Sequence, residues 1–409
     1  MRILTPDQIT TMPGSPLGVL RAFQRDPLAM CARARDLGGI VSIPSLSDPV
    51  FAVSQPEAVL KLLSASPDLV WKGTSEELFG NRPWAVRRKA VQPHFRREAA
   101  ETWPEIIRKH ADALVEAWIA SPGPVEVVAD MNRMTQRVIC EAMLGVVLDP
   151  DTEARAMRSL DVILSGFTWK TMLPGPGASP SIRHRRAVAS LHAVADAIIG
   201  RLRSGPAPGV IGASIAANDR GDLSSSDLRG EVITLLLAAH ETTANTVAWT
   251  LGLLTHAPEV LASVSADARL GQMGLVDAAV SEGVRLFPPA WVLARDIREP
   301  IDLGSATLPA GSRVFVPIAA IHRDPRTWRD PDAFRPDRWT APAQKGTYLP
   351  FGAGPRGCIG EHLARLESRE VVTRVLQQAR IEAVEGLPEP EPGVTLRPRG
   401  DMKLRVLER

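Results

Sequence analysis

The chain has 409 residues, of which 48 are Lys or Arg and 46 are Asp or Glu, so its net charge is +2 at pH 7. This balance, with 44% apolar residues, excludes a disordered chain and a polycation dedicated to nucleic acid. The sparse cysteines, Cys31, Cys140 and Cys358, do not resemble a secreted disulfide framework, and no signal peptide or membrane-length apolar stretch occurs. We therefore expect a cytoplasmic protein without a membrane anchor.

The chain contains no linker, repeat or low-complexity tract, so we expect a single domain over residues 1–409. Segments rich in β-branched residues predict hairpins at 39–54 and 301–320, both belonging to small peripheral sheets. Apolar residues at helical spacing predict helices over 84–91, 101–120, 131–148, 151–167, 181–202, 227–256, 276–286 and 361–379. The predicted fold class is mainly α with small β-sheets.

The helix at 227–256 is the most informative predicted element. About 30 residues at ~1.5 Å each form a rod of ~45 Å, which would cross the whole domain. Its middle reads LLLAAHETTANT, where Glu241, Thr242 and Thr243 interrupt an apolar stretch. Buried polar groups need a partner or a function. The simplest partner for Thr242 is the carbonyl of Ala238, one turn back; a catalytic role is the alternative.

A second unusual segment is FGAGPRGCIG at 351–360, which is followed at once by the helix at 361–379. Its G-x-G-x-x-G spacing does not indicate a dinucleotide site, because Pro350 precedes it and Gln377 stands where an acidic residue is expected. Glycines and a helix N-terminus both stabilise a thiolate at Cys358. One cysteine without a second ligand does not fit zinc but fits an axial ligand of haem iron, with Arg356 near a propionate. A buried, inert cysteine is the alternative.

The pattern F-G-x-G-x-R-x-C-x-G-x-x-x-A-x-x-E runs unbroken from Phe351 through Gly360 and Ala364 to Glu367. It resembles the haem-binding signature of the cytochromes P450, and other landmarks of that family follow in order. Residues 238–243 resemble the oxygen-binding segment of its long distal helix, with Ala239 where glycine is commonest. The resemblance covers nearly the whole chain and implies a P450 fold with a long central distal helix.

Glu282 and Arg285 resemble the E-x-x-R pair of the family, and residues 334–339 resemble its F-x-P-E-R-F segment, where Arg338 supplies a third member. Aspartate and tryptophan replace the usual glutamate and phenylalanine there. Taken by itself, the i,i+3 pair is typical of a solvated ion pair worth a few tenths of a kcal/mol. The resemblance implies instead a buried cluster with a structural role near the haem.

The resemblance further implies haem b, with Cys358 as the metal ligand. Donors at matching places would bind the propionates, namely Trp84 and Arg88 on one helix, Arg295 and Arg356, although Arg87 could replace Arg88. Further cofactor contacts are expected at Ala238, Phe351, Gly360 and Ala364. The segments 71–80 and 167–180 stand where the family places its variable substrate lids. Candidates for the substrate pocket, each also explicable as core, are Phe79, Phe167, Trp169, Met172, Leu235, Ala238, Ala239, Trp291, Val292, Leu293 and Leu396.

These features predict a haem-thiolate monooxygenase that uses O2 to hydroxylate or epoxidise an apolar small molecule, such as a terpenoid or a fatty acid. Thr242 would relay protons, and Glu241 would link that relay to solvent. A peroxide-driven or redox-neutral haem-thiolate enzyme is the first alternative, and the Glu241-Thr242 pair argues against it. A non-catalytic haem sensor or binding protein is the second.

The expected partners are a separate ferredoxin and ferredoxin reductase, because little sequence follows Cys358 before the chain ends. Basic residues near the cysteine side of the haem would form the docking face, namely Arg87 or Lys89, Arg96, Arg97 and Arg365. The basic groups at 87–97 and 183–186 lack the interleaved aromatic residues expected of a nucleic-acid site. We expect no nucleic-acid partner, and a monomer.

Overall fold

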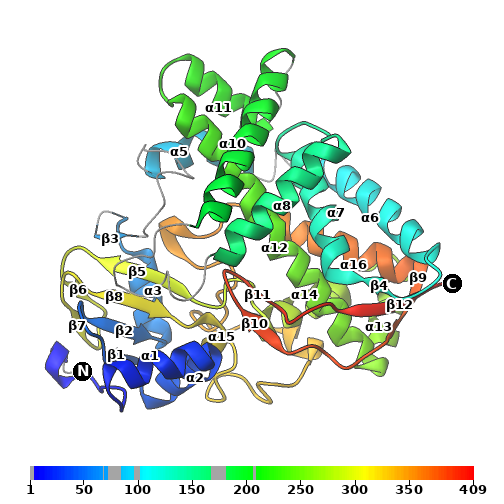
Figure 1. Cartoon of the computed structure of the whole chain (residues 1–409). Coiled ribbons are helices and arrows are strands. Elements are labelled where there is room, and N and C mark those ends of the chain that lie inside the picture. Colours follow the sequence, from blue (N-terminus) through cyan, green and yellow to red (C-terminus); the bar gives the residue numbers. More distant parts are fainter. Residues whose placement is uncertain (1–3, 68, 72–83, 96–101, 167–180, 206–208) are drawn as a thin grey trace.

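The fold is described from a computed structural model, which describes residues 4–67, 69–71, 84–95, 102–166, 181–205 and 209–409. Most of this part of the chain is helical, as predicted (Figure 1). The helices are α1 Pro16–Arg25, α2 Pro27–Leu37, α3 Pro56–Ser64, α5 Trp84–Val91, α6 Trp103–Ile119, α7 Val127–Ala142, α8 Pro150–Gly166, α10 Ile182–Arg203, α11 Gly209–Asp219, α12 Ser225–Thr255, α13 Pro258–Arg269, α14 Gly274–Leu286, α15 Ile318–Ile321 and α16 Glu361–Gln378.

Every helix predicted from periodicity is present, but the helix predicted at 131–148 begins earlier and ends earlier, as α7. Gly145 has a φ of +66°, outside the helical region, and α7 ends before it. Periodicity did not predict α1, α2, α3, α11, α13 or the short α15, which lies at the end of the segment predicted as a hairpin. Four of these, α1, α2, α3 and α13, begin with proline, a start signal that was available in the sequence.

The strands form small sheets, and the largest has the order β1-β2-β8-β5-β3. Its members are β1 Ile40–Ile43, β2 Val50–Val53, β3 Val70–Trp71, β5 Leu293–Ile297 and β8 Arg313–Val316. The smaller sheets pair β6 Ile301–Asp302 with β7 Thr307–Leu308, β10 Pro390–Pro392 with β11 Leu396–Pro398, and β12 Lys403–Glu408 with both β4 Val125–Glu126 and β9 Ala379–Ala383.

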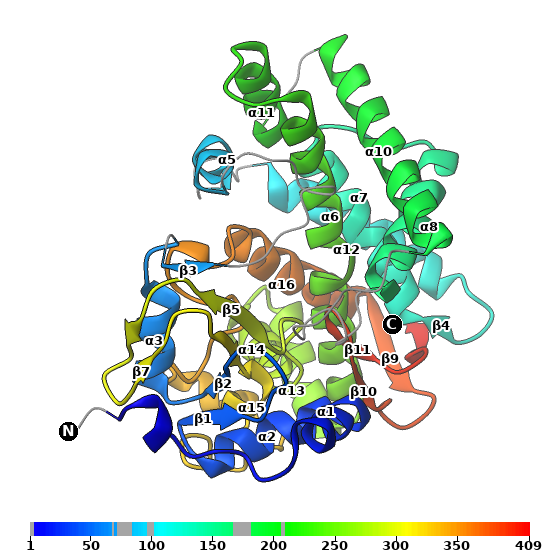
Figure 2. The same ribbon diagram turned by 60° about the vertical axis from the view of Figure 1, so that its left-hand side comes forward.

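The two predicted hairpin regions are not separate sheets. The antiparallel hairpins β1-β2 and β6-β7 occur as expected, but β2 also pairs in parallel with β8, which joins the two regions. Parallel neighbours need a long connection, so no local pattern could show this pairing. The sheet lies on one side of the molecule beside α1, α2 and α3, and the helices fill the other side (Figure 2).

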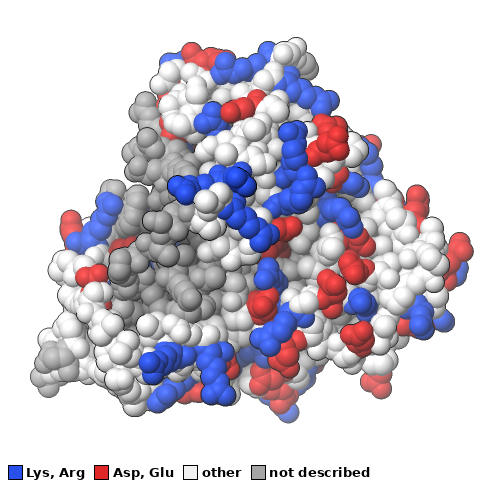
Figure 3. All heavy atoms as spheres, in the orientation of Figure 1, with Lys and Arg blue, Asp and Glu red and all other residues white. Residues whose placement is uncertain are grey.

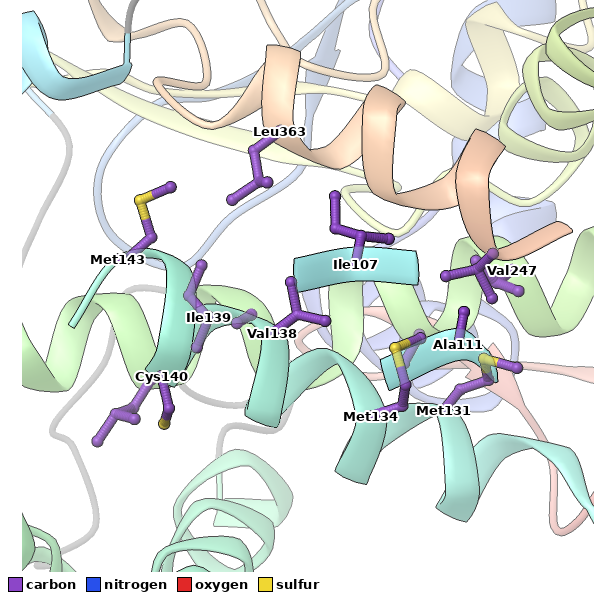
Figure 4. Packing of buried hydrophobic residues seen from close by; sticks show 14 of the residues in the cluster. Ile107, Ala111, Met131, Met134, Val138, Ile139, Cys140, Met143, Val247 and Leu363 are labelled. Carbon is purple, nitrogen blue, oxygen red and sulfur yellow. The ribbon is translucent and has the colours of Figure 1, made fainter. Parts of the chain in front are cut away.

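α12 runs through the middle of the helical part and is buried along most of its length (Figures 1 and 2). Its start is a capping box, in which Ser224 accepts from the Asp227 N–H and the Asp227 carboxylate accepts from the Ser224 N–H. α6, α7, α12 and α16 pack together around Ile107, Met131, Val247 and Leu363 (Figure 4). This core fixes α12 and α16 relative to one another.

No helix within the described ranges combines the length and the apolar character that spanning a bilayer requires.

Candidate functional site

The cysteine loop lies between residues 351 and 360 and folds back on itself. Gly352 and Gly354 both have a φ of +69°, which favours glycine. A Cβ on Gly354 would also lie 2.1 Å from the carbonyl oxygen of Leu63, so the loop can approach the end of α3 only with glycine there. The Cys358 N–H donates to the carbonyl of Phe351 at 2.8 Å, which closes the turn.

Cys358 is exposed, whereas the other two cysteines are buried. Burial raises the pKa of both Cys31 and Cys140 to about 12, so these two remain thiols. Gly360, next to Cys358, is the N-cap of α16, and the Ala364 N–H donates to its carbonyl at 2.9 Å in the first turn. The positive end of the helix dipole therefore lies close to Cys358, where it favours a thiolate.

The last residue of the cysteine motif, Glu367, is buried within α16. Burial raises the pKa of its carboxyl group to about 8, so the group is protonated at neutral pH. It therefore adds no negative charge near Cys358.

The middle of α12 carries the Ala-rich segment singled out in the sequence. The Thr242 hydroxyl donates to the Ala238 carbonyl at 2.6 Å, as expected. Ala238 is exposed although Leu236, Ala239 and His240 around it are buried, so this part of the rod presents an open surface. Thr135 of α7 donates to the carbonyl of Ala239 at 3.1 Å from the buried side.

Glu241, one turn along α12 from Ala238, is 8% exposed. Its carboxylate accepts a hydrogen bond of 2.5 Å from the Thr395 hydroxyl. The guanidinium of Arg397 lies 3.7 Å from the other carboxylate oxygen. Neither of these partners was predicted, because they follow Glu241 by more than a hundred residues and no motif marks them.

Adjacent arginines on α5 reach in different directions. Arg88 donates to the carbonyl of Gly357, directly before Cys358, at 2.9 Å. Arg87 is buried and pairs with Glu231 of α12 at 3.3 Å. The structure therefore places Arg88, and not Arg87, beside the cysteine loop. The side chain of Trp84 lies outside the described residues.

Arg295 on β5 is a buried cation whose Nη1 donates to the carbonyl of Ala294 at 2.8 Å. Burial and, secondly, the charge of Arg356 lower its pKa to about 10. Within the described ranges, no carboxylate lies in salt-bridge range of Arg295. Two neighbouring cations at a buried position favour an anionic group between them.

Glu282 and Arg285 on α14 are both 0% exposed and form a bidentate pair at 2.8 and 2.9 Å. Arg338 donates to the same carboxylate at 2.8 Å, and so does the indole N–H of Trp339 at 3.0 Å. The solvated ion pair is therefore excluded. The tryptophan that replaces phenylalanine in the motif is also more than a conservative change, because phenylalanine has no N–H to donate.

The predicted pocket residues fall into three groups. Trp291 and Leu396 are each 1% exposed and pack together with Cys31 in the core; their contact with a substrate stays a prediction. Leu235 and Ala239 lie on α12 at the edge of the core, and Val292 and Leu293 are half-buried near β5; their contact with a substrate stays a prediction. The candidates outside the described residues are Phe79, Phe167, Trp169 and Met172.

Comparison with known proteins agrees with this geometry. The sequence model of the family described as cytochrome P450 matches residues 28–404. Two relatives from Streptomyces melanosporofaciens are cyclooctatin synthase, 30% identical over 97% of this chain and 93% of that protein, and cyclooctat-9-en-7-ol 5-monooxygenase, 28% identical over 92% and 90%. Pentalenene oxygenase from Streptomyces avermitilis is 24% identical, and the match covers 95% of this chain and 93% of that protein.

Solved structures agree as well. The P450 CYP175A1 from Thermus thermophilus superposes with a TM-score of 0.79 at 26% identity and covers 100% of both chains. A six-coordinated P450 from a second strain of Thermus thermophilus gives a TM-score of 0.76 at 26% identity over 94% of this chain and 99% of that one. The fold and the site define a haem-thiolate oxidoreductase. The chain belongs to the cytochrome P450 family.

The residues present fit a haem. Ala238, a small and exposed residue in an otherwise buried rod, leaves room for a flat group beside α12. The mutually repelling Arg295 and Arg356 match the negative charge of a propionate. The exposed Cys358, with glycines around it, supplies one soft ligand.

Proposed function

We propose that this P450 is an O2-dependent monooxygenase that hydroxylates or epoxidises an apolar molecule of the terpenoid class. One observation carries the proposal: α12 turns an acid and an alcohol, Glu241 and Thr242, to the two sides of the exposed Ala238 surface. Such a pair can supply protons. O2 activation consumes protons, whereas a peroxide-driven or redox-neutral reaction does not need an acid-alcohol pair to supply them.

In this proposal Cys358 binds the iron, and Arg88, Arg295 and Arg356 hold the propionates. When bound, the haem supplies the electron transfer and O2 chemistry that no side chain can provide. The Cys358 thiolate is kept ionised by the dipole of α16. Phe351 begins the cysteine loop, and the Arg365 guanidinium lies 4.7 Å from the centre of its ring.

The Thr242 hydroxyl has a defined resting position, because it donates a hydrogen bond of 2.6 Å to the Ala238 carbonyl. A hydroxyl can give up that bond and donate toward the open side, so it can deliver a proton there. Glu241, the preceding residue on the helix, would resupply the proton. In this scheme Thr242 acts in proton delivery and Glu241 acts as the acid behind it.

The terpenoid class is supported by both chemistry and relatives. The candidate pocket residues that the structure leaves open to prediction, Leu235, Ala239, Val292 and Leu293, are all apolar. An apolar lining favours an apolar substrate. The relatives are named for cyclooctat-9-en-7-ol and pentalenene. Titrating both compounds, and a fatty acid as a comparison, into ferric protein tests the class through the displacement of iron-bound water, seen as a Soret shift.

Replacing Thr242 with Ala should preserve haem and substrate binding but divert reducing equivalents into hydrogen peroxide. The reason is that the variant loses the hydroxyl that delivers the proton. Product formed per NAD(P)H should drop about 10- to 100-fold, the usual size of an acid-base contribution.

The matched control is Thr246→Ala, one turn further along α12. Thr246 makes the same kind of bond, to the Thr242 carbonyl at 3.0 Å, but lies within the buried part of the rod. Its replacement should leave the product yield per NAD(P)H close to that of the wild type. Full coupling in Thr242→Ala would contradict the O2-dependent mechanism and favour a peroxide-driven enzyme or a sensor.

We propose that a separate ferredoxin, itself reduced by a ferredoxin reductase, supplies the electrons to a monomeric enzyme. Two cations of the predicted docking face, Lys89 on α5 and Arg365 on α16, are exposed. Glu361 pairs with Arg365 at 2.9 Å, which leaves Lys89 as the better test position. Arg96 and Arg97 lie outside the described residues.

Reduction by ferredoxin should slow as salt rises past physiological strength, where the Debye length falls below ~8 Å. Lys89→Glu should slow it further, because complementary charge acts mainly on the encounter rate. Arg185→Glu is the matched control, because it reverses an exposed positive charge on α10 and not on α5. Cations also gather over α8 and α10, on the face shown in Figure 3. Equal effects of the two variants, or salt-independent reduction, would place the docking face elsewhere.

A further inference from the structure

The hairpin formed by β10 and β11 lies against one face of α12. Glu241, Asn245 and Trp249 occupy that face at intervals of one helical turn. The Trp249 indole donates to the carbonyl of Leu396 at 3.3 Å, and Asn245 donates to the Thr395 hydroxyl at 3.1 Å. These contacts fix the position of the hairpin relative to Glu241.

Thr395 directly precedes β11 and Arg397 lies within it. Both reach Glu241, from 2.5 and 3.7 Å. Leu396, between them, turns the other way and packs against Trp291. The hairpin thus presents a hydroxyl and a cation to one carboxylate.

The direction of the hydrogen bonds at Thr395 is set by Asn245. An amide NH2 group can only donate, so the Thr395 oxygen accepts from Asn245. Its single proton is then left for Glu241, which must accept with an oxygen that carries no proton. Asn245 and Thr395 are both buried, so water does not compete for these bonds.

Arg397 connects this buried group to the surface. Its guanidinium is half-exposed and donates to the half-exposed Glu391 of β10 at 2.8 Å. Arg397 therefore lies between solvent and one carboxylate oxygen of Glu241. Thr395 binds the other oxygen of the same carboxylate.

We propose that Thr395 is a positioning residue for Glu241, and that Arg397 holds the solvent side of the same carboxylate, so that the β10-β11 hairpin keeps Glu241 where it can exchange protons with solvent and pass them toward Thr242. This inference rests on the proposed O2-dependent function, in which Glu241 resupplies Thr242. Without the Thr395 hydroxyl, the carboxylate is free to turn toward Arg397 and away from the helix. Arg397 places a positive charge beside the buried carboxylate and balances the negative charge on it.

The first test compares Thr395→Val with Thr395→Ser in the haem-containing enzyme, reduced by its ferredoxin system. Valine keeps the branched shape and removes the hydroxyl, whereas serine keeps the hydroxyl. Thr395→Val should release about 10-fold more hydrogen peroxide per product, the factor expected for one hydrogen bond to a charged group. Thr395→Ser should restore the wild-type ratio. Equal leakage in both variants would show that shape, and not the hydroxyl, matters, and would overturn the proposal.

The cation is tested by Arg397→Gln against Arg399→Gln. Both variants remove one positive charge from the same hairpin, but Arg399 is exposed and Glu241 is not among its contacts. Arg397→Gln should raise peroxide release severalfold, and Arg399→Gln should not change it. Equal effects of the two would mean that only the net charge of the hairpin counts, against the proposed contact.

A readout independent of turnover is a double-mutant cycle on the stability of the ferric holoenzyme. Urea midpoints are measured for Glu241→Ala, which removes the acceptor, for Thr395→Val and for the double variant, with the Soret band and ferrous-CO spectrum confirming an intact haem site. The shifts of the single variants should not add, because each removes the same hydrogen bond. Additive shifts would contradict the contact.

The outcomes separate this inference from the proposed function. If Thr242→Ala uncouples the reaction while Thr395→Val does not, the O2-dependent function stands and the hairpin relay is wrong. If Thr242→Ala also remains coupled, the proposed function itself fails.

Discussion

Replacing Cys358 with Ser is expected to abolish the red-shifted Soret band of the ferrous-CO complex that thiolate ligation produces. Serine has a hydroxyl in place of the sulfur and is not ionised near neutral pH, so the iron loses its electron-rich ligand. The cysteine loop should keep its shape, because its turns depend on Gly352, Gly354 and the bond from the residue 358 N–H to Phe351, and a serine leaves all of these unchanged. Monooxygenase activity should be lost as well.

Cys31→Ala and Cys140→Ala are the controls for this variant. Both cysteines are buried with pKa values raised to about 12, so neither can serve as a thiolate. Their removal should lower stability slightly through lost packing while the ferrous-CO spectrum stays that of the wild type. An unchanged spectrum in Cys358→Ser would mean that another residue ligates the iron and would overturn the assignment of the site.

Arg285→Ala is expected to give protein that contains almost no haem. Arg285 forms both bonds to Glu282 and also donates to the carbonyls of His322, Pro331 and Ala333. Removing it strands a carboxylate that is 0% exposed, at a cost of about 3–5 kcal/mol. Such a loss is a large share of the ~5–15 kcal/mol that stabilises a typical domain.

The effect is measured as haem absorbance per protein and as the midpoint of urea unfolding. Trp339→Phe is the graded control, because it removes only the indole donor to the same Glu282 carboxylate and keeps an aromatic ring. It should cost about 1–3 kcal/mol and leave most of the haem bound. If Arg285→Ala kept a haem content near that of the wild type, the Glu282–Arg285 pair would not be needed for haem binding, as its spacing alone first suggested.

Both variants act on residues that the sequence identified, but for different reasons. Cys358 was recognisable because two features that favour its thiolate are local: glycines within six residues and a helix start three residues on. Glu282 and Arg285 are also neighbours on one helix, yet their spacing is equally compatible with a solvated pair. Burial decided between the two interpretations, and burial is a property of the packed chain.

In the long helix α12, too, some features follow from the local sequence and others only from the packed chain. Its start, its length and the Thr242 bond to Ala238 follow from capping residues, periodicity and an i−4 hydroxyl, all within a few turns. The partners of Glu241 could not be inferred in this way. Thr395 and Arg397 reach it only because the β10-β11 hairpin folds back across α12.

The sequence by itself determined the elements whose causes are local: the main helices, the tight glycine-rich loop that marks Cys358 as the expected thiolate ligand and, through the family pattern, the fold. Only the tertiary structure decided that β2 pairs with β8, that Arg88 and not Arg87 reaches the cysteine loop, that Trp339 donates to Glu282, and that a hairpin holds Glu241. The physical reason is that backbone preferences act over a few residues, whereas burial and long-range hydrogen bonds depend on which surfaces the whole chain brings together.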